Sequence, residues 1–284
     1  MSSPSTEAQT RGGPGGRGGP GGRGGPGGRG GRGRPAPLRA TVVTNERLTP
    51  HLTRLTVTGE QFDRYAWVGP AAHFKITVPN PGEHDVFIPE PGPDGTVSYG
   101  DAPRIVRTYT ARSYDPTSRQ LEIDVVLHGE GPVSSWAEQA GPGSRLAVSV
   151  PRNAGFTEDP EAEWLLVAAD TSALPAVATI IEVATKPATI FIEVGDPTDQ
   201  LDLGHEVQWL ASIPGQPGRA LEDAVAAFDA PPGRGQIWIA SEAQAIRRIR
   251  GRLLETYSRD QFTTRGYWRS GEQNHPDHDY GEDD

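Results

Sequence analysis

The 284-residue chain contains no cysteine, and this absence removes several classes of chemistry. Without thiols the protein can form no disulfide, ligate no zinc or iron–sulfur cluster through Cys and run no dithiol exchange. An electron-transfer function would therefore depend on an organic cofactor. Lysine is also scarce, because only Lys75 and Lys186 occur against 25 arginines.

Long apolar runs are absent as well. No run approaches the ~18 residues of a membrane-spanning helix, and no apolar segment typical of a secretion signal follows the first residues. We therefore expect a cytoplasmic protein without membrane contact. The first 34 residues hold six Arg and one Glu, so the remaining 250 residues carry about −15 within the total net charge of −10. This acidic body argues against nucleic acid as the main partner, and an anionic ligand would need a local basic pocket.

The two ends of the chain are unlike the rest. Three copies of RGGPGG cover residues 11–28, and sequence so rich in Gly, Pro and Arg predicts a disordered tail over 1–36. Such repeats can contact RNA without sequence preference, or can act only as a solubilising tail. The segment 275–284 groups His275, Asp277, His278 and Asp279. Terminal ligands lack fixed geometry, so we predict an acidic flexible C-terminus and no metal site.

Between these ends, the first half of the chain reads as strands. Residues 38–59 predict two alternating strands around a polar turn, and further strands are predicted at 73–79, 106–115 and 121–129. Gly- and Pro-rich turns separate them, and the first predicted helix is short, at 132–140. Many strands with little helix indicate an antiparallel barrel or sandwich.

The second half alternates strands and helices, which indicates a parallel α/β sheet. The predicted strands are 163–170, 189–196, 207–212 and 236–241, and the predicted helices are 172–185, 221–230 and 242–258. A polar linker at 155–162 separates the halves. The predicted domains are therefore an antiparallel β-barrel over 37–158 and an α/β domain over 159–274.

Five short motifs occur in an order that resembles the siderophore-interacting protein family. They are RTYTAR (107–112), HGEGPVSSWA (128–137), AADTSALPA (168–176), IASEAQAIRRIR (239–250) and RGYWRSG (265–271). The resemblance covers about residues 37–281. It implies a ferredoxin-reductase-like protein, with an FAD-binding barrel followed by an NAD(P)H-binding domain.

The first motif then implies four flavin contacts. Arg107 offers a planar fork to the flavin pyrophosphate, and Arg112 adds a second cation. Tyr109 stacks on the isoalloxazine or bonds the ribityl chain, and the Thr110 hydroxyl reaches the N5 edge, where hydride arrives. Successive residues of a strand point to opposite faces, so the strand must end or bend here, or the flavin must wrap its edge. Taken alone, the motif favours an edge strand that carries solvated arginines, and the other motifs turn the interpretation toward flavin binding.

The second motif implies that the chain from Asp124 through Val126 to His128 lies beside the flavin. Glycines such as Gly131 permit close approach of the backbone. Ser134 and Ser135 begin a helix whose N–H groups suit a pyrophosphate. A structural or stacking role for His128 is expected in preference to proton donation.

The α/β half has no glycine fingerprint after its first strand. The resemblance instead assigns the nicotinamide cofactor to a capped turn, with Asp170, Thr171, Ser172 and Ala173, and to Glu242. A capped helix alone would explain the same turn. In the fourth motif the family has A-G-E where this chain has A-S-E (Ala240, Ser241 and Glu242).

Glu193 stands where an acid commonly holds the adenine ribose. Together with Asp196 and Asp199, and without an adjacent Arg, it favours NADH over NADPH.

The substrate implied by the resemblance is a ferric siderophore, which is bulky and anionic. Candidate binding residues are Lys75, Arg152, Arg265 and Arg269, although each could instead form a surface ion pair. The implied function is that of a monomeric, FAD-dependent ferric-siderophore reductase with Thr110 as its catalytic residue. Two alternatives stay open. One is a flavin reductase with another acceptor or with ferredoxin as donor, and the other is a non-enzymatic module that contacts RNA through its tail.

Overall fold

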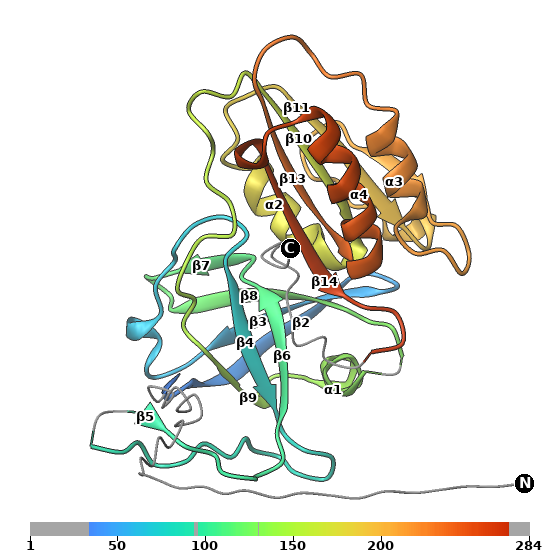
Figure 1. Ribbon diagram of the computed structural model, residues 1–284. Helices are drawn as coiled ribbons and strands as arrows, with labels where there is room; N and C mark the ends of the chain where they lie inside the picture. The colour runs from blue at the N-terminus through green and yellow to red at the C-terminus, as the bar shows by residue number, and fades with distance from the viewer. Residues whose placement is uncertain (1–33, 94–95, 130, 273–284) are drawn as a thin grey trace, which may run out of the picture. The chain divides into compact units, whose positions relative to one another are not determined.

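The computed structural model describes residues 34–93, 96–129 and 131–272. These residues belong to one compact unit, Arg34–Asp284. Most of the predicted N-terminal tail, residues 1–33, and the predicted acidic C-terminus, residues 275–284, lie outside the described residues. Figure 1 shows an antiparallel sheet built by the first half of the chain and a parallel sheet built by the second.

The antiparallel sheet is barrel-like and has seven strands in the order β6-β4-β9-β2-β3-β8-β7. Its strands are β2 (Leu38–Thr49), β3 (Leu52–Thr58), β4 (His73–Val78), β6 (Ile105–Thr110), β7 (Ser113–Asp115), β8 (Gln120–Val126) and β9 (Arg145–Val148). A core that includes Leu55, Phe62, Phe74 and Ile123 fills its interior. The short 3-10 helix η1 (Phe62–Arg64) and helix α1 (Pro132–Gln139) pack against this core. Two further short strands, β1 (Arg34–Pro35) and β5 (Thr96–Val97), pair only with each other among the described strands.

The single strand predicted over 106–115 is wrong, because the chain changes partner in its middle. β6 pairs with β4, with Thr110 opposite His73, and ends there. The amide of Ala111 then donates to Ala72 O at 2.9 Å, whereas that of Arg112 donates to Glu122 O at 3.0 Å. From this point the chain pairs with β8 as β7.

The parallel sheet has the order β12-β11-β10-β13-β14. Its strands are β10 (Trp164–Asp170), β11 (Ala188–Val194), β12 (Gln208–Ala211), β13 (Gly235–Glu242) and β14 (Phe262–Trp268). β10 is buried along its whole length, as expected for a central strand covered on both faces. β14 was not predicted as a strand, because its sequence FTTRGYW is mixed in polarity; it pairs with β13 as a parallel edge strand.

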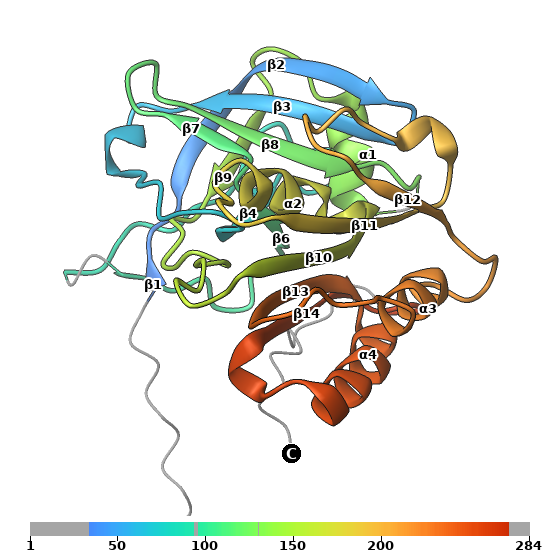
Figure 2. The ribbon, with the colours of Figure 1, turned by 90° about the horizontal axis from the view of Figure 1, so that it is seen from above.

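Helices cover both faces of this sheet (Figure 2). α2 (Leu174–Ile181) follows the 3-10 turn η2 (Thr171–Ala173) and packs on one face. α3 (Arg219–Ala226) and α4 (Ala243–Thr256) pack on the other. Two 3-10 turns, η3 (Pro197–Asp199) and η4 (Arg259–Gln261), complete the half. Within the described residues, no helix is both long enough and apolar enough to cross a membrane.

Specific hydrogen bonds join the two sheets. The Ala71 amide donates to Thr179 Oγ1 at 2.9 Å, and Thr49 Oγ1 donates to the buried Asp199 carboxylate at 2.7 Å. Leu52 of the antiparallel sheet is part of the apolar cluster under α2. The predicted order of an antiparallel barrel followed by a parallel α/β domain is therefore confirmed.

Candidate functional site

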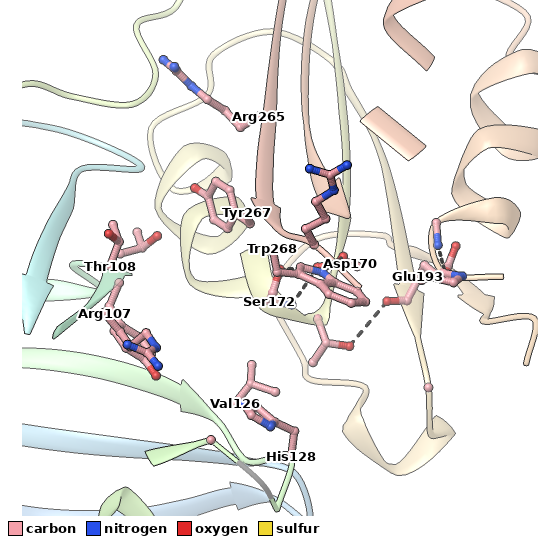
Figure 3. A pocket seen from close by; sticks show the side chains of 18 of the residues that line it. Arg107, Thr108, Val126, His128, Asp170, Ser172, Glu193, Arg265, Tyr267 and Trp268 are labelled. Atoms are coloured by element: carbon pink, nitrogen blue, oxygen red, sulfur yellow. Dashed lines mark hydrogen bonds between the residues drawn. The ribbon is translucent and has the colours of Figure 1, made fainter. Parts of the chain in front are cut away.

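A cavity of about 960 Å³ is lined by residues of both sheets. The antiparallel half supplies the end of β6, the end of β8 and the start of α1, and the parallel half supplies the ends of β10 and β14 and the loop before α3. Figure 3 shows Arg107, Val126 and His128 on one wall and Asp170, Ser172 and Trp268 on the facing one. The cavity is large enough for more than one small ligand, because typical ligand pockets measure about 300–1,000 Å³.

The wall from the antiparallel half is an open seam between two strands. Among the described strands, β6 pairs with β4 alone. β8 pairs with β3 along its length, whereas its pairing with β7 stops at Glu122. One backbone edge of residues 107–110 and one backbone edge of residues 124–126 therefore have no partner among the described strands, and both segments line the cavity. A ligand at such an edge can touch successive residues of one strand, which explains why Arg107, Thr108, Tyr109 and Thr110 all line the cavity.

The RTYTAR motif divides at the end of β6. Arg107 and Tyr109 are half-buried and Thr110 is buried, and all three line the cavity. Burial raises the pKa of the Tyr109 hydroxyl, and the nearby Arg107 opposes this shift. Arg112 instead donates from Nη2 to Glu182 Oε1 at 2.6 Å, so it ties the barrel to the end of α2. Arg112 is not among the described residues that line the cavity. The guanidinium predicted as a second cation near the pyrophosphate is paired with Glu182 instead.

The β8 edge is held from behind by an ion pair. Asp124 is buried and accepts two hydrogen bonds from Arg54, from Nε at 2.7 Å and from Nη2 at 2.9 Å. These hydrogen bonds raise the pKa of Arg54 against the opposing effect of its own burial. Asp124, Val126 and His128 line the cavity, as the sequence predicted for a backbone edge beside the flavin.

The start of α1 completes this wall. The His128 amide donates to Ser134 Oγ at 3.0 Å, which fixes the turn, and the His128 ring lies over Gly131. A Cβ atom on Gly131 would lie 2.5 Å from His128 Cε1, so any other residue there would displace the His128 ring. The helix has Pro132 at its first turn and no acidic residue in that turn, so an anion is not repelled there. Ser134 lines the cavity, whereas Ser135 does not belong to the described lining.

These features fit a flavin dinucleotide. An open seam between two strand edges suits a flat ring system, Arg107 suits a phosphate, and Gly131 and α1 allow close backbone approach.

On the facing wall, Asp170 is a hydrogen-bond centre. Its buried carboxylate caps η2 by accepting from the Ser172 amide at 2.9 Å. It also accepts from Ser241 Oγ and from Trp268 Nε1, each at 2.8 Å. One carboxylate thus connects the ends of three strands and holds the indole of Trp268 at the cavity. Asp170, Thr171 and Ser172 line the cavity; Ala173 is fully buried and is not in the described lining.

Glu193, predicted as a ribose acceptor, lies at the end of β11 and caps a helix. Its two buried oxygens accept from the amides of Gly218 and Leu221, each at 2.9 Å, and so cap α3. Burial raises the pKa of Glu193, and the negative charge of Asp170 adds to that effect. Glu193 still lines the cavity. Arg219, which follows Gly218, is thereby brought close to Glu193, although the two residues are far apart in the sequence. The Arg219 guanidinium pairs with Asp223 at 2.9 Å.

Glu242 caps α4 in the same way, by accepting from the amides of Gln244 at 2.7 Å and Ala245 at 3.0 Å. It is buried and lies outside the described cavity lining, so the structure commits it to the helix rather than to a cofactor.

The four candidate substrate cations separate into two groups. Arg265 and Arg269 line the cavity, and Arg269 also pairs with Glu272 at 3.1 Å. Lys75 is exposed, and its Nζ lies 3.2 Å from Oγ1 of the lining residue Thr108. Arg152 is exposed and is not brought to the cavity within the described part of the chain.

Several lining residues escaped the sequence analysis. His73 begins β4, Tyr267 and Trp268 end β14, and residues 212–218 form the loop before α3. The GYW motif pointed to the region of Trp268 without assigning it a role. The place of His73 depends on the pairing of β4 with β6, which no local pattern reports.

Two family models match the chain. The siderophore-interacting FAD-binding domain matches residues 41–155, and the siderophore-interacting protein model matches residues 162–271. The ferric vibriobactin reductase ViuB of Vibrio cholerae is 30% identical over 84% of this chain and 91% of its own length. The NADPH-dependent ferric-chelate reductase of Escherichia coli is 29% identical over 81% and 92%.

Solved structures agree. A siderophore utilization protein from T. fusca matches with a TM-score of 0.76 and 34% identity, covering 87% of this chain and 97% of that one. A ferredoxin NADP+ reductase from Neisseria gonorrhoeae has a TM-score of 0.55 at 14% identity, covering 81% and 98%, and shows the shared fold alone. The chain therefore belongs to the siderophore-interacting protein family, and is an oxidoreductase of the ferredoxin-reductase-like fold with an FAD-binding domain in its first half.

Proposed function

We propose that this chain is a cytoplasmic, monomeric, FAD-dependent ferric-siderophore reductase that takes electrons from NAD(P)H, with NADH preferred, and releases Fe(II). One observation carries the proposal. A single cavity is lined by the open seam of the FAD-binding half, by the capped turn of the α/β half and by two arginines near the end of the chain. Electron donor, flavin and anionic acceptor can therefore meet in one place.

On the seam, Arg107 would pair with the flavin pyrophosphate together with the first turn of α1. The backbone edge from Asp124 to His128 would hold the ring system, since this edge has no strand partner beyond Glu122 on the cavity side among the described residues. Tyr109 would pack on the ring, and the buried Thr110 hydroxyl would lie at its reactive edge. Bound FAD supplies the conversion between a two-electron donor and one-electron transfer to iron.

On the facing wall, Thr171 and Ser172 would meet the nicotinamide cofactor, and the ring of Trp268 is fixed beside them by Asp170. The acids Asp170 and Glu193 line this side, and Arg219 is already paired with Asp223. A 2′-phosphate would approach these two carboxylates, which supports a preference for NADH. A contact between Glu193 and the ribose stays a prediction.

Arg265 and Arg269, which line the cavity, and Lys75, which neighbours the lining residue Thr108, would attract an anionic ferric chelate to an otherwise acidic protein. Reduction to Fe(II) lowers the charge of the metal, and hard oxygen ligands then hold it less tightly. The protein would position donor and acceptor and keep the chelate at the flavin edge.

The test is an absorption spectrum of the purified protein during anaerobic titration, first with NADH or NADPH and then with a ferric siderophore. We expect bleaching of a flavin spectrum by NADH and its return as the ferric chelate is reduced. A colourless protein that takes up no FAD would overturn the proposal.

Arg107→Ala should weaken FAD retention and Thr110→Val should change the rate of flavin reduction. The exposed Arg64→Ala, outside the described lining, is the matched control and should change neither.

A further inference from the structure

His73 lies where the two halves of the protein supply the cations of the cavity. It is the first residue of β4, is half-buried, and faces Thr110 across the ladder. Lys75 follows two residues later on the same strand, opposite Thr108. Arg265 reaches the same end of the cavity from β14, and Figure 3 shows Arg265 and Thr108 away from Glu193.

The surroundings of His73 disfavour its charged form in the free protein. Burial lowers the pKa of His73, and the positive charges of Arg265 and Lys75 lower it further. From β6, Arg107 and Tyr109 also line the cavity, and from β14 so does Tyr267. His73 therefore favours its neutral form in the free protein, beside the positive charges of Arg265 and Lys75.

Two of the four described acidic lining residues, Asp124 and Glu272, are paired with arginines, whereas Asp170 and Glu193 lie on the facing wall, away from Arg265 (Figure 3). Asp124 bonds Arg54, Asp170 accepts from Trp268, Glu193 caps α3, and Glu272 pairs with Arg269. An anionic ligand in this end of the cavity would reverse the balance, since a nearby negative charge favours the imidazolium. Binding of the anion and uptake of one proton by His73 are then linked.

We propose that His73 carries a proton into the site with the anionic ferric chelate and delivers it to a chelate oxygen after the iron is reduced. The inference rests on the proposed function. Fe(III) takes one electron from the reduced flavin, one iron–oxygen bond breaks, and the oxygen keeps its electron pair. The imidazolium gives its proton to that oxygen and becomes neutral, and it takes up another proton from solvent when the next anionic chelate binds.

Among the described neighbours of His73, no other group can fill this role as well. Lys75 and Arg265 hold their protons near neutral pH. Burial raises the pKa of Tyr109, so its hydroxyl is a weak acid there. Among these groups, histidine is the side chain that changes charge in the working range. Protonation of the freed oxygen also prevents it from binding the iron again.

The test compares His73→Gln with the matched control His84→Gln, an exposed histidine outside the described lining. The probe is the ferric complex of a hexadentate tris-catecholate, titrated into FAD-loaded protein without nicotinamide. In the wild type and in H84Q, affinity should rise about three- to fivefold from roughly pH 8 to roughly pH 6, because a pKa increase of about one unit on binding gives at most a tenfold change, which is complete only below the pKa of the free protein. In H73Q the change should be less than about twofold. Calorimetry in two buffers of different ionisation enthalpy should show proton uptake by the wild type that H73Q lacks.

A second variant protects the test against misfolding. His73→Arg keeps a permanent charge, so it should bind the chelate at every pH but release Fe(II) to a trapping ligand more slowly than the wild type. A wild type that binds and reduces the chelate with no proton uptake, or an H73Q that matches its pH profile, overturns the role of His73 alone. Failure of the wild type to bind or reduce the chelate at any pH overturns the proposed function itself.

Discussion

Replacement of Asp124 by alanine should both destabilise the barrel and loosen the cavity. The carboxylate is 5% exposed, and it accepts from Arg54 Nε at 2.7 Å and Nη2 at 2.9 Å. The Arg54 side chain is 24% exposed. Without Asp124, most of its charged guanidinium would stay buried without its ion-pair partner. The nearest remaining acid is Glu122, whose Oε2 lies 3.8 Å from Arg54 Nη1.

Removal of one partner of a buried ion pair costs about 3–5 kcal/mol. Because Glu122 can turn toward the abandoned cation, we expect Asp124→Ala to lower the free energy of unfolding by about 3 kcal/mol, at the low end of that range. Asp124→Asn keeps one acceptor oxygen and should lose about 2 kcal/mol, the value of one hydrogen bond to a charged group. Glu122→Ala removes the longer, more exposed pair and should cost less than about 1 kcal/mol.

Urea unfolding of the FAD-free and FAD-loaded proteins measures these differences. FAD loading should recover less stability in D124A than in the wild type, because the strand edge beside the cavity moves with Asp124. The double variant R54A/D124A should lose less than the sum of the single variants, since it leaves no unpaired charge. Equal losses in D124A and E122A, or strict additivity in the double variant, would refute this account.

Two further outcomes follow from local geometry. Gly131→Ala should speed FAD release and leave the FAD-free stability within about 1 kcal/mol, because the new Cβ displaces the ring of His128 without backbone strain; unchanged FAD retention in a dialysis assay would contradict this. Hydrogen bonds from Ser258 and from Arg234 lower the pKa of Asp260 from 3.8 to about 2. The stability that this carboxylate contributes is therefore present above pH 3.8 and is lost as the pH falls toward 2. Arg234→Gln should reduce the change in stability between pH 3.8 and about 2, measured as the midpoint of urea unfolding at each pH. A variant whose midpoints follow the wild-type curve would contradict this prediction.

Much of the fold was predictable because its signals act over a few residues. Alternation of apolar and polar residues predicted β2, β3 and β4, and the continuous apolar run at 163–170 predicted the central strand β10. Glycine- and proline-rich turns separated these elements, and the motifs around Arg107 and His128 located the flavin side of the cavity.

The errors arose where pairing over long distances decides the outcome. The stretch 106–115 has strand composition throughout, yet β6 pairs with β4 and β7 with β8, so the strand divides at its centre. β14 has mixed polarity and is a strand only because β13 offers it a parallel edge.

What the sequence determined by itself was the order of the two sheets, the cofactor class implied by the motifs, and the acidic body that requires a local basic pocket. The tertiary structure decided which charged groups remain available to ligands. Arg112 is committed to Glu182, and Glu193 and Glu242 are committed to helix ends, whereas His73 and Arg265 are brought to one end of the cavity from different sheets. The physical reason is that a charge is assigned to its partner by distance and burial. Those quantities are set when strands far apart in the chain pair and pack.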